Sequence, residues 1–389
     1  MSIKLSISAI NTYLQCPKKY QIQYEYKIYP EEKSSALLFG SAIDKALNDV
    51  LENHGKSDEE IIKVGISTFH KEWEQQQDRT VGTIDLPFNT NIKYSKYDFD
   101  SDLLTEEDNG TIQKELVEYN RDLKSEVNSA EEVIEYVEGL MKWQDNIKES
   151  HKRMYNFINW VCLRRKGEHI IKAYVKDLLP AIEKVIEVQT ELSIEDNKKN
   201  RLVGVSDFIA ILKPGKYGNT ELLQSETVIP DNKTSSTAYD ENSVESSPQL
   251  STYRYILNAT KGYNIKKGAY FVVQKKFKKV KTKICKSCGN VAESSHKTCN
   301  ATVNNKRCGG EWDVKVSIEV PTQIVLQDIS DEFTDMVMEN ADSVIKAVEA
   351  EIFPRNLNSC DSQFGSKCPY INYCHKKCMT GLINTKKET

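Results

Sequence analysis

Five residues in three nearby segments have the types and spacing needed for hydrolysis assisted by a metal ion. They are Asp207 in VGVSDFIA, Asp231 and Lys233 in VIPDNKT, and Gln249 and Tyr253 in PQLSTY. Side chains alternate faces along a strand, so Asp231 and Lys233 are expected to point the same way. Carboxylates bind a hard cation, which polarises a phosphate and acidifies a water that a lysine can orient. Gln249 and Tyr253, four positions apart, are expected to share one face of a helix.

The elements that must position these residues alternate between helices and strands. The hydrophobic pattern predicts a core made of a helix at 173–183, strands at 185–194, 201–212 and 221–233, a helix at 248–259 and a strand at 268–276. Further helices are expected at 39–52, 59–76, within 111–164 and at 328–351, with a loop at 78–108. This order predicts an α/β fold in which helices flank a mixed central sheet.

The three segments resemble motifs of the PD-(D/E)XK nuclease superfamily, and in particular its RecB-like exonuclease branch. There a G-x-x-D motif, a D-x-K motif and a Q-x-x-x-Y motif follow one another, and positions 204–207, 231–233 and 249–253 fill them in that order. Pro230 is incidental, because the first acid of the superfamily corresponds to Asp207. The resemblance implies a restriction-endonuclease-like PD-(D/E)XK core. To it this chain adds a helical insertion, which RecB-like nucleases tolerate at this point, and a zinc-ribbon-like insertion, which is not standard for the family.

The resemblance also implies a chemistry, that of a deoxyribonuclease dependent on Mg²⁺ or Mn²⁺. Asp207 and Asp231 would bind the metal, and Lys233 would position the water that attacks the phosphate. Gln249 and Tyr253 would orient either the DNA strand or the lysine.

A fourth position departs from the RecB-like pattern. Those nucleases usually carry a histidine in a G-x-x-x-H-x-x-L-like stretch before the core, and in the corresponding stretch, 39–47, Asp44 stands in its place. A carboxylate also binds Mg²⁺ or Mn²⁺, so Asp44 is expected to assist as a metal ligand. The other interpretation is an exposed polar residue on an amphipathic helix. Glu191, together with Glu187 on the same strand face, is a further candidate ligand.

The ten cysteines are clustered, and one group joins the two ends of the chain. Cys16, with Cys360, Cys368 and Cys374, resembles the iron–sulfur variety of RecB-like nucleases, in which four thiolates hold a [4Fe–4S] cluster. The Cys-Pro-x-x-x-x-Cys element is its specific part. Cys378 is an alternative to Cys360, which we prefer because it follows a Phe-Pro-Arg-Asn segment typical of the family. A zinc site or reduced thiols are the other interpretation.

A second group has the spacing of a structural zinc site. Its C-x-x-C knuckle is followed by two more cysteines, giving the set Cys285, Cys288, Cys299 and Cys308. The segment between them is too polar to form its own core, so metal binding would supply its folding free energy. His296 is a weaker candidate ligand. Cys162 has no companion and is expected to be a buried apolar residue.

Charge is distributed unevenly over the 389 residues, whose net charge is −4. Positions 246–292 hold ten lysines and one arginine without any acid, whereas positions 98–150 hold sixteen acids against five bases. Aromatic residues are interleaved with the basic ones, which suits a phosphate backbone and stacked bases. The residues predicted to bind DNA are Lys275, Lys276, Lys278 and Lys279. The alternative is a solvated, lysine-rich hairpin.

The expected organisation has five parts. These are N-terminal helices at 1–52, a helical insertion at 53–170, the nuclease core at 171–282, the four-cysteine zinc insertion at 283–313, and a C-terminal part at 314–389 with the last strand, a helix and the iron–sulfur segment. No apolar run is long enough to cross a bilayer and the N-terminus lacks a secretory layout, so no membrane association and a cytoplasmic location, in a bacterial or phage-infected cell, are expected.

The leading hypothesis is a DNA exonuclease acting in recombination, repair or phage DNA processing. Its substrate would be single-stranded DNA or duplex ends. Because the sequence shows no phosphate-binding loop of an ATP motor, a separate helicase or recombination protein is a candidate partner. The alternatives are a catalytically inactive nuclease-fold subunit that binds DNA, and a zinc-ribbon protein of the transcription type, which explains only Cys285 to Cys308.

Overall fold

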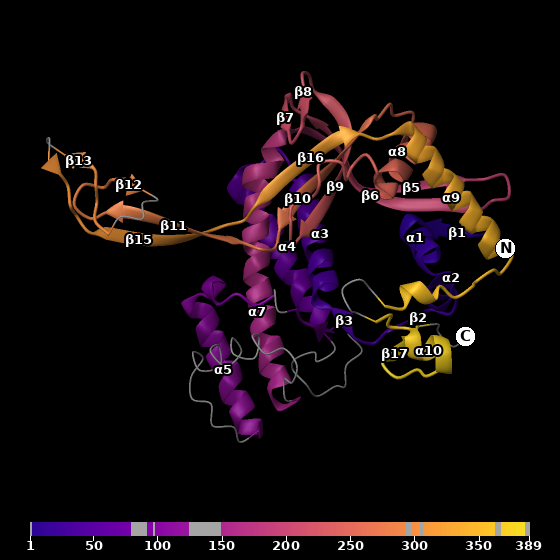
Figure 1. The fold of residues 1–389 in the computed structure, drawn as a ribbon, viewed down its shortest axis with the longest axis horizontal. Helices are drawn as coiled ribbons and strands as arrows, with labels where there is room; N and C mark the ends of the chain where they lie inside the picture. The colour runs from indigo at the N-terminus through magenta and orange to yellow at the C-terminus, as the bar shows by residue number, and fades with distance from the viewer. Residues whose placement is uncertain are drawn as a thin grey trace.

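The centre of the molecule is a six-stranded mixed sheet (Figure 1). The computed structural model describes residues 2–78, 92–95, 98–123, 149–292, 297–303, 306–361 and 367–385. The strands follow the order β1-β6-β9-β10-β16, and β5 pairs with the other edge of β6. β1 with β6 and β9 with β10 are parallel, and the remaining pairs are antiparallel. The strands are β1 (Lys4–Ser6), β5 (Ile182–Glu195), β6 (Arg201–Leu212), β9 (Glu226–Ser235), β10 (Lys267–Gln274) and β16 (Thr322–Asp328).

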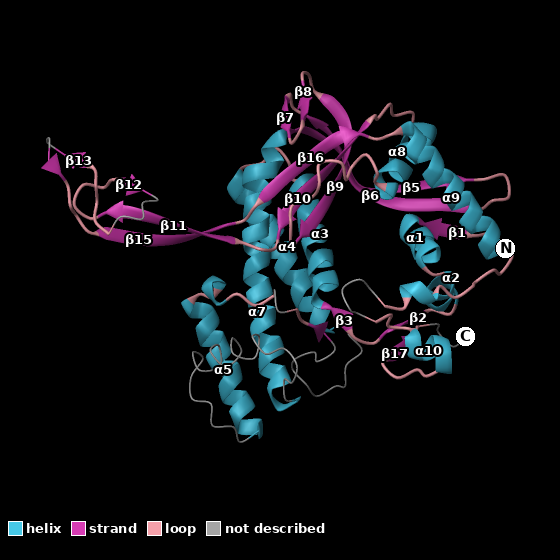
Figure 2. Ribbon diagram, viewed as in Figure 1, coloured by secondary structure: helices cyan, strands magenta, loops and turns pink. Residues whose placement is uncertain are grey.

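Helices cover both faces of this sheet (Figure 2). One face packs against α3 (Ser35–Glu52), α4 (Asp58–Asp78) and α7 (Glu149–Ala173), and the other against α1 (Ile7–Gln15), α8 (Pro248–Lys261) and α9 (Asp331–Glu349). β10 shows the alternation: Phe271 and Val273 join the first core, and Tyr270 and Val272 the second. A strand buried on both faces is continuously apolar, as β10 is. The predicted α/β class, a mixed sheet flanked by helices, is confirmed.

The region expected as a helical insertion shares a hydrophobic core with the central sheet. Phe39 of α3 lies 5.8 Å from both Phe69 and Trp73 of α4, measured between ring centroids. A Cβ at Gly167 of α7 would come within 2.2 Å of the Phe69 ring, so a glycine is needed where the two helices cross. α5 (Glu106–Leu123) packs on α7 from the outside.

The helix predicted at 173–183 is not a separate α-helix but the irregular end of α7. α7 ends at Ala173, a π-helical turn covers Tyr174–Leu178, a 3-10 turn covers Leu179–Ala181, and β5 begins at Ile182. Pro180 lies inside the 3-10 turn and has no N–H to donate, so the chain does not return to a regular α-helix before β5. The loop expected at 78–108 falls partly outside the described residues, and its described part includes a 3-10 turn at Ser101–Leu103 and the start of α5.

A long two-stranded ribbon projects from the sheet (Figure 1). Its strands β11 (Lys278–Cys285) and β15 (Trp312–Glu319) continue β10 and lead into β16. The tip carries the short strands β12 (Val291–Ala292), β13 (Thr302–Val303) and β14 (Lys306–Arg307). The insertion expected at 283–313 therefore forms the outer part of a longer ribbon.

The two ends of the chain are tied together. β2 (Ile28–Pro30) pairs with β17 (Leu382–Asn384), and the Tyr13 hydroxyl donates to the Ile352 carbonyl at 2.6 Å. The remaining elements are α2 (Pro17–Tyr20), a π turn (Gln21–Glu25), β3 (Lys33–Ser34), β4 (Ile92–Lys93), β7 (Gly215–Tyr217), β8 (Thr220–Leu222), a 3-10 turn (Leu357–Ser359) and α10 (Ile371–Lys376). Within the described ranges, no helix combines the length and apolar character needed to cross a membrane.

Candidate active site and cysteine centres

The candidate active site lies where β6 and β9 separate. β1 pairs with Arg201–Val203 of β6 and β9 pairs with Ala210–Leu212, so Asp207 lies in the stretch between these two ladders. The backbone N–H of Asn232 donates to Asp207 Oδ2 at 2.8 Å and bridges the separation. The Asp207 side chain therefore takes the place of a backbone hydrogen bond between β6 and β9, and the two strands diverge beside its carboxylate.

Asp231 and Lys233 lie on one face of β9, as strand alternation predicts. The Lys233 ammonium forms an ion pair with Asp231 Oδ2. Gln249 completes a small network, because its Nε2 donates to Asp231 Oδ1 at 2.7 Å and its Oε1 accepts from Lys233 Nζ at 3.3 Å. Asp231 is 1% exposed, and its two oxygens lie against Lys233 and Gln249.

α8 presents Gln249 and Tyr253 to this network. Ser247 caps the helix by accepting from the Leu250 N–H at 3.2 Å, and Pro248 occupies the first helical position. Gln249 Nε2 also donates to the Tyr253 hydroxyl at 3.2 Å. The Tyr253 ring lies over Gly204, where a Cβ would come within 2.5 Å of Cε1. This contact explains why the strand carries a glycine three residues before Asp207.

All three carboxyl groups of this site have a raised pKa, and in two of them the charge of a neighbouring carboxylate contributes. Burial is the main cause of the raised pKa of Asp207, and the charges of Asp231 and Asp44 raise it further. Burial also raises the pKa of Asp231, against the lowering effect of Lys233. Asp44 reaches the site from α3, and burial followed by the charge of Asp231 raises its pKa. Mutual repulsion of this kind is relieved when a cation binds.

The Lys233 ammonium stays charged despite its burial. Burial lowers its pKa, but the charges of Asp231 and Asp207 outweigh that effect and raise the pKa overall. Its Nζ also lies 5.6 Å from the centroid of the Tyr270 ring, a cation–π distance. A charged lysine can donate to a water or to a phosphate oxygen, whereas it cannot act as a general base.

The sequence patterns did not identify three residues of this site. Tyr270 is in register with Asp231 through the parallel β9–β10 pairing, and its hydroxyl donates to Ser247 Oγ at 2.6 Å. The Tyr174 hydroxyl, in the π turn after α7, donates to Asn232 Oδ1 at 3.0 Å. Tyr270 is placed by strand pairing and Tyr174 by an irregular helix end, and neither feature gives a periodic pattern in the sequence. Asn232 could have been noticed, because it lies between Asp231 and Lys233.

The arrangement suits a divalent cation held by oxygen. Asp207, Asp231 and Asp44 supply hard carboxylate ligands, and Lys233 supplies a positive charge beside them. The three carboxylates are not drawn tightly together: in the described part of the chain, only a set of four cysteines brings three or more such ligand atoms within 4.8 Å of one another. A cation at this site would thus draw the carboxylates together.

Comparison with known protein families agrees with this geometry. The model of the PD-(D/E)XK nuclease superfamily matches residues 4–87 and 95–375. The chain belongs to the PD-(D/E)XK nuclease superfamily. The match includes both the sheet with its candidate site and the ribbon. Membership implies a metal-dependent nuclease. No curated protein matches the chain.

Two glutamates proposed as further ligands do not fit this PD-(D/E)XK site. Glu187 forms an ion pair with Lys261 at 2.6 Å and accepts from the Tyr263 hydroxyl at 2.8 Å, near the C-terminal end of α8. Glu191 pairs with Val205 in the β5–β6 ladder and is exposed. Gln189, between the two glutamates, has a φ of +52°, so the regular alternation of faces along β5 is interrupted there and spacing along this strand was misleading.

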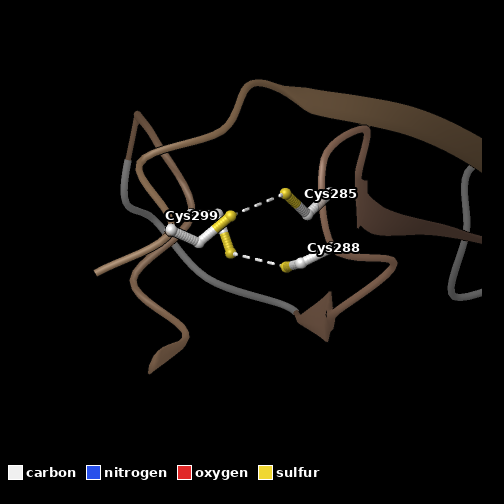
Figure 3. Close-up of side chains that lie close together, drawn as sticks. Cys285, Cys288 and Cys299 are labelled. Atoms are coloured by element: carbon white, nitrogen blue, oxygen red, sulfur yellow. Dashed lines mark hydrogen bonds between the residues drawn. The ribbon is translucent and has the colours of Figure 1, made fainter. Parts of the chain in front are cut away.

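The tip of the ribbon holds a compact set of four thiols (Figure 3). Cys285 Sγ lies 3.6 Å from Cys308 Sγ, and Cys288 Sγ lies 3.7 Å from Cys299 Sγ. Four sulfurs bound at about 2.3 Å around a tetrahedral ion lie about 3.8 Å apart, so this set fits a single zinc ion. Gly310 faces the set, because a Cβ there would come within 2.8 Å of Cys285 Sγ. His296 lies outside the described residues.

The thiol of Cys285 is prepared for metal binding. Burial raises its pKa, but hydrogen bonds from the backbone N–H groups of Cys288 and Ser287, together with neighbouring thiols, lower it overall to about 6. The thiolate is the form that binds a metal. Cys162, by contrast, is fully buried in the helical core, as expected.

The terminal cysteines form a second, looser group. The thiols of Cys16, Cys368 and Cys374 each affect the pKa of Cys360, which burial raises first. Burial also raises the pKa of Cys16, yet backbone N–H groups and the Ser359 hydroxyl lower it overall. Cys378 is exposed and its Sγ lies 3.2 Å from the Thr380 hydroxyl.

The segment Phe353-Pro-Arg-Asn356 supports this group. The Phe353 ring stacks on Tyr20 at 6.1 Å between centroids. Asn356 Nδ2 donates to the Gln15 carbonyl at 2.8 Å, and Arg355 Nη2 donates to the Cys374 carbonyl at 2.9 Å. These contacts fix the C-terminal cysteines beside Cys16.

The basic stretch does not form one surface with its aromatic residues. Tyr253, Tyr270 and Phe271 are buried in the two cores, which prevents them from stacking on bases. Lys279 forms an ion pair with Asp102, and Lys275 is half-buried. Lys276 and Lys278 are exposed at the root of the ribbon.

Proposed function

We propose that this protein is a DNA nuclease of the RecB-like type that degrades DNA from an end during recombination, repair or phage DNA processing. The observation that carries the proposal is the network in which Gln249 connects Asp231, Lys233 and Tyr253 beside Asp207. An acid pair with a charged lysine at the point where two strands separate is suited to phosphodiester hydrolysis.

Each side chain has a distinct role in this proposal. Asp207 and Asp231 bind Mg²⁺ or Mn²⁺, and Asp44 assists from α3. When bound, the metal polarises the phosphate and acidifies a water. Lys233 orients that water and neutralises charge as it develops on the phosphate. Gln249 holds the lysine and Asp231 in place, and Tyr253 fixes the position of Gln249.

The two cysteine groups have structural roles in the proposal. Cys285, Cys288, Cys299 and Cys308 hold zinc at the tip of the ribbon. Cys16, Cys360, Cys368 and Cys374 hold a [4Fe–4S] cluster that ties the two ends of the chain together. Lys276 and Lys278 contact the DNA backbone near the active site, with Lys275 and Lys279 beside them.

The test is the cleavage of end-labelled DNA by the Lys233→Ala variant. Without the ammonium group, cleavage with Mg²⁺ or Mn²⁺ should fall at least about a hundredfold, while DNA binding persists. Lys216→Ala, which removes an exposed lysine on β7, is the matched control and should cleave normally. Wild-type cleavage rates in the Lys233 variant would refute the assignment.

Linear and circular substrates compared in parallel separate the remaining alternatives. An exonuclease degrades linear DNA and leaves closed circles intact, whereas cleavage of circles at the same rate contradicts end-dependent action. Binding without any cleavage would favour the inactive DNA-binding subunit.

A further inference from the structure

The surface at the end of the ribbon has a charge opposite to that of the rest of the molecule. Residues 278–319 contain nine lysines and arginines against four acids, although the whole chain has a net charge of −4. The described tip exposes four basic side chains, namely Lys286, Lys297, Lys306 and Arg307. Of these, Lys286 contacts an acid, Glu311, at 3.5 Å, in a pair that is largely open to solvent. Such pairs contribute little and exchange readily for another anion.

The ribbon is anchored at its root. Phe277 packs edge-on against His169 of α7 at 5.8 Å between centroids and joins the helical core. Lys279 forms an ion pair with Asp102, in the 3-10 turn that precedes α5. Eight continuous residue pairs then join β11 to β15. An anchored ladder holds its tip at a defined distance from the sheet.

That distance corresponds to more than one turn of duplex DNA. Tyr270 lies beside the active-site lysine, and Cys285 begins the tip fifteen residues later. At about 3.3 Å per residue the path is at most about 50 Å, the length of about 15 base pairs at 3.4 Å each. The four thiols fix the shape of the tip, whose segments are otherwise too polar to pack.

We propose that the ribbon tip binds the phosphate backbone of duplex DNA up to about 15 base pairs from the scissile phosphate, so that the protein contacts the duplex at two separated points. The inference rests on the proposed nuclease function, because it places the same DNA in the active site. The positive charge of the tip and its fixed reach favour nucleic acid over a protein partner.

The experiment measures how tightly the full-length protein, with its zinc bound, binds duplexes of 10 and 24 base pairs. Mg²⁺ and Mn²⁺ are left out so that the DNA is not cleaved. The tip variant changes Lys286, Lys297, Lys306 and Arg307 to Gln. The control variant changes four exposed lysines of the body to Gln, Lys4, Lys198, Lys199 and Lys216. The tip variant should bind the long duplex at least about tenfold more weakly and with a smaller salt dependence, since each phosphate contact contributes about 0.9 to that slope.

The short duplex should bind equally well to all three proteins. Zinc content serves as the check on folding, and Lys306→Gln with Arg307→Gln alone is the milder variant if the fourfold change loses zinc. Wild-type protein that binds both lengths equally, or a tip variant that matches the control, overturns the inference even if DNA is cleaved. In the second case, the exposed Val291 and Val303 would indicate a protein partner instead. Length-dependent binding through the tip without any cleavage would overturn the proposed nuclease function and leave the contact standing.

Discussion

Gly204→Ala should damage the active site without touching any residue that carries chemistry. The new Cβ would lie 2.5 Å from Tyr253 Cε1, whereas carbon atoms pack at about 3.5 Å or more, so the ring must move by roughly 1 Å. The Tyr253 hydroxyl lies 3.2 Å from Gln249 Nε2, and this movement breaks that hydrogen bond. Gln249 then loses the contact that positions it against Asp231 and Lys233.

Two magnitudes follow from this displacement. Overpacking costs about 1–3 kcal/mol, and the Gly→Ala change in the unfolded chain offsets about 0.4–1 kcal/mol, which leaves a net loss of up to about 2.6 kcal/mol, centred on about 1.3 kcal/mol. A misplacement of about 1 Å at a catalytic group can reduce the rate by up to about a hundredfold. We expect the rate of DNA cleavage to fall between about tenfold and a hundredfold.

The assay combines urea unfolding with cleavage of labelled DNA. Gly110→Ala on α5 is the matched control, because a Cβ there meets nothing within 4 Å. In a Tyr253→Ala background the clash disappears, so Gly204→Ala should cost no stability there. Wild-type stability and cleavage in Gly204→Ala, or the same stability loss with and without the Tyr253 ring, would refute the reasoning.

Two further predictions concern the ionisable and metal-binding groups. Burial, followed by the charges of Asp231 and Asp44, raises the pKa of Asp207, so the folded metal-free protein loses stability as the pH rises from about 4 through that raised pKa. Asp207→Asn should therefore raise the thermal unfolding midpoint of the metal-free protein at neutral pH by about 1–4 °C. It should also abolish the further rise in the midpoint that Mg²⁺ or Mn²⁺ produces in the wild-type protein. A lowered midpoint in the metal-free variant would contradict this reasoning. Protein purified without oxygen should be brown and contain iron and zinc, as visible absorption and metal analysis would show. Cys16→Ala and Cys360→Ala should lose the colour. Cys285→Ala should lose only zinc, and Cys378→Ala should lose neither the colour nor zinc. Colourless, iron-free wild-type protein would exclude the cluster.

The sequence determined the parts of the site that depend on short-range geometry. The two-residue period of a strand placed Asp231 and Lys233 on one face, and the helical period placed Gln249 beside Tyr253. The close spacing of Cys285 and Cys288 likewise marked the thiol set at the tip of the ribbon. These relations follow from backbone dihedral angles alone, so they can be inferred without knowledge of the fold.

The tertiary structure alone decided which distant segments meet. The approach of Asp44 from α3, the separation of β6 from β9 at Asp207, and the pairing of Tyr270 with Asp231 all join residues with no common period. Burial also keeps Tyr270, an aromatic residue of the basic stretch, from contacting DNA bases. Strands pair so that their apolar faces can be buried together, and this depends on the whole chain. The spacing of residues within one segment therefore does not reveal which strands pair.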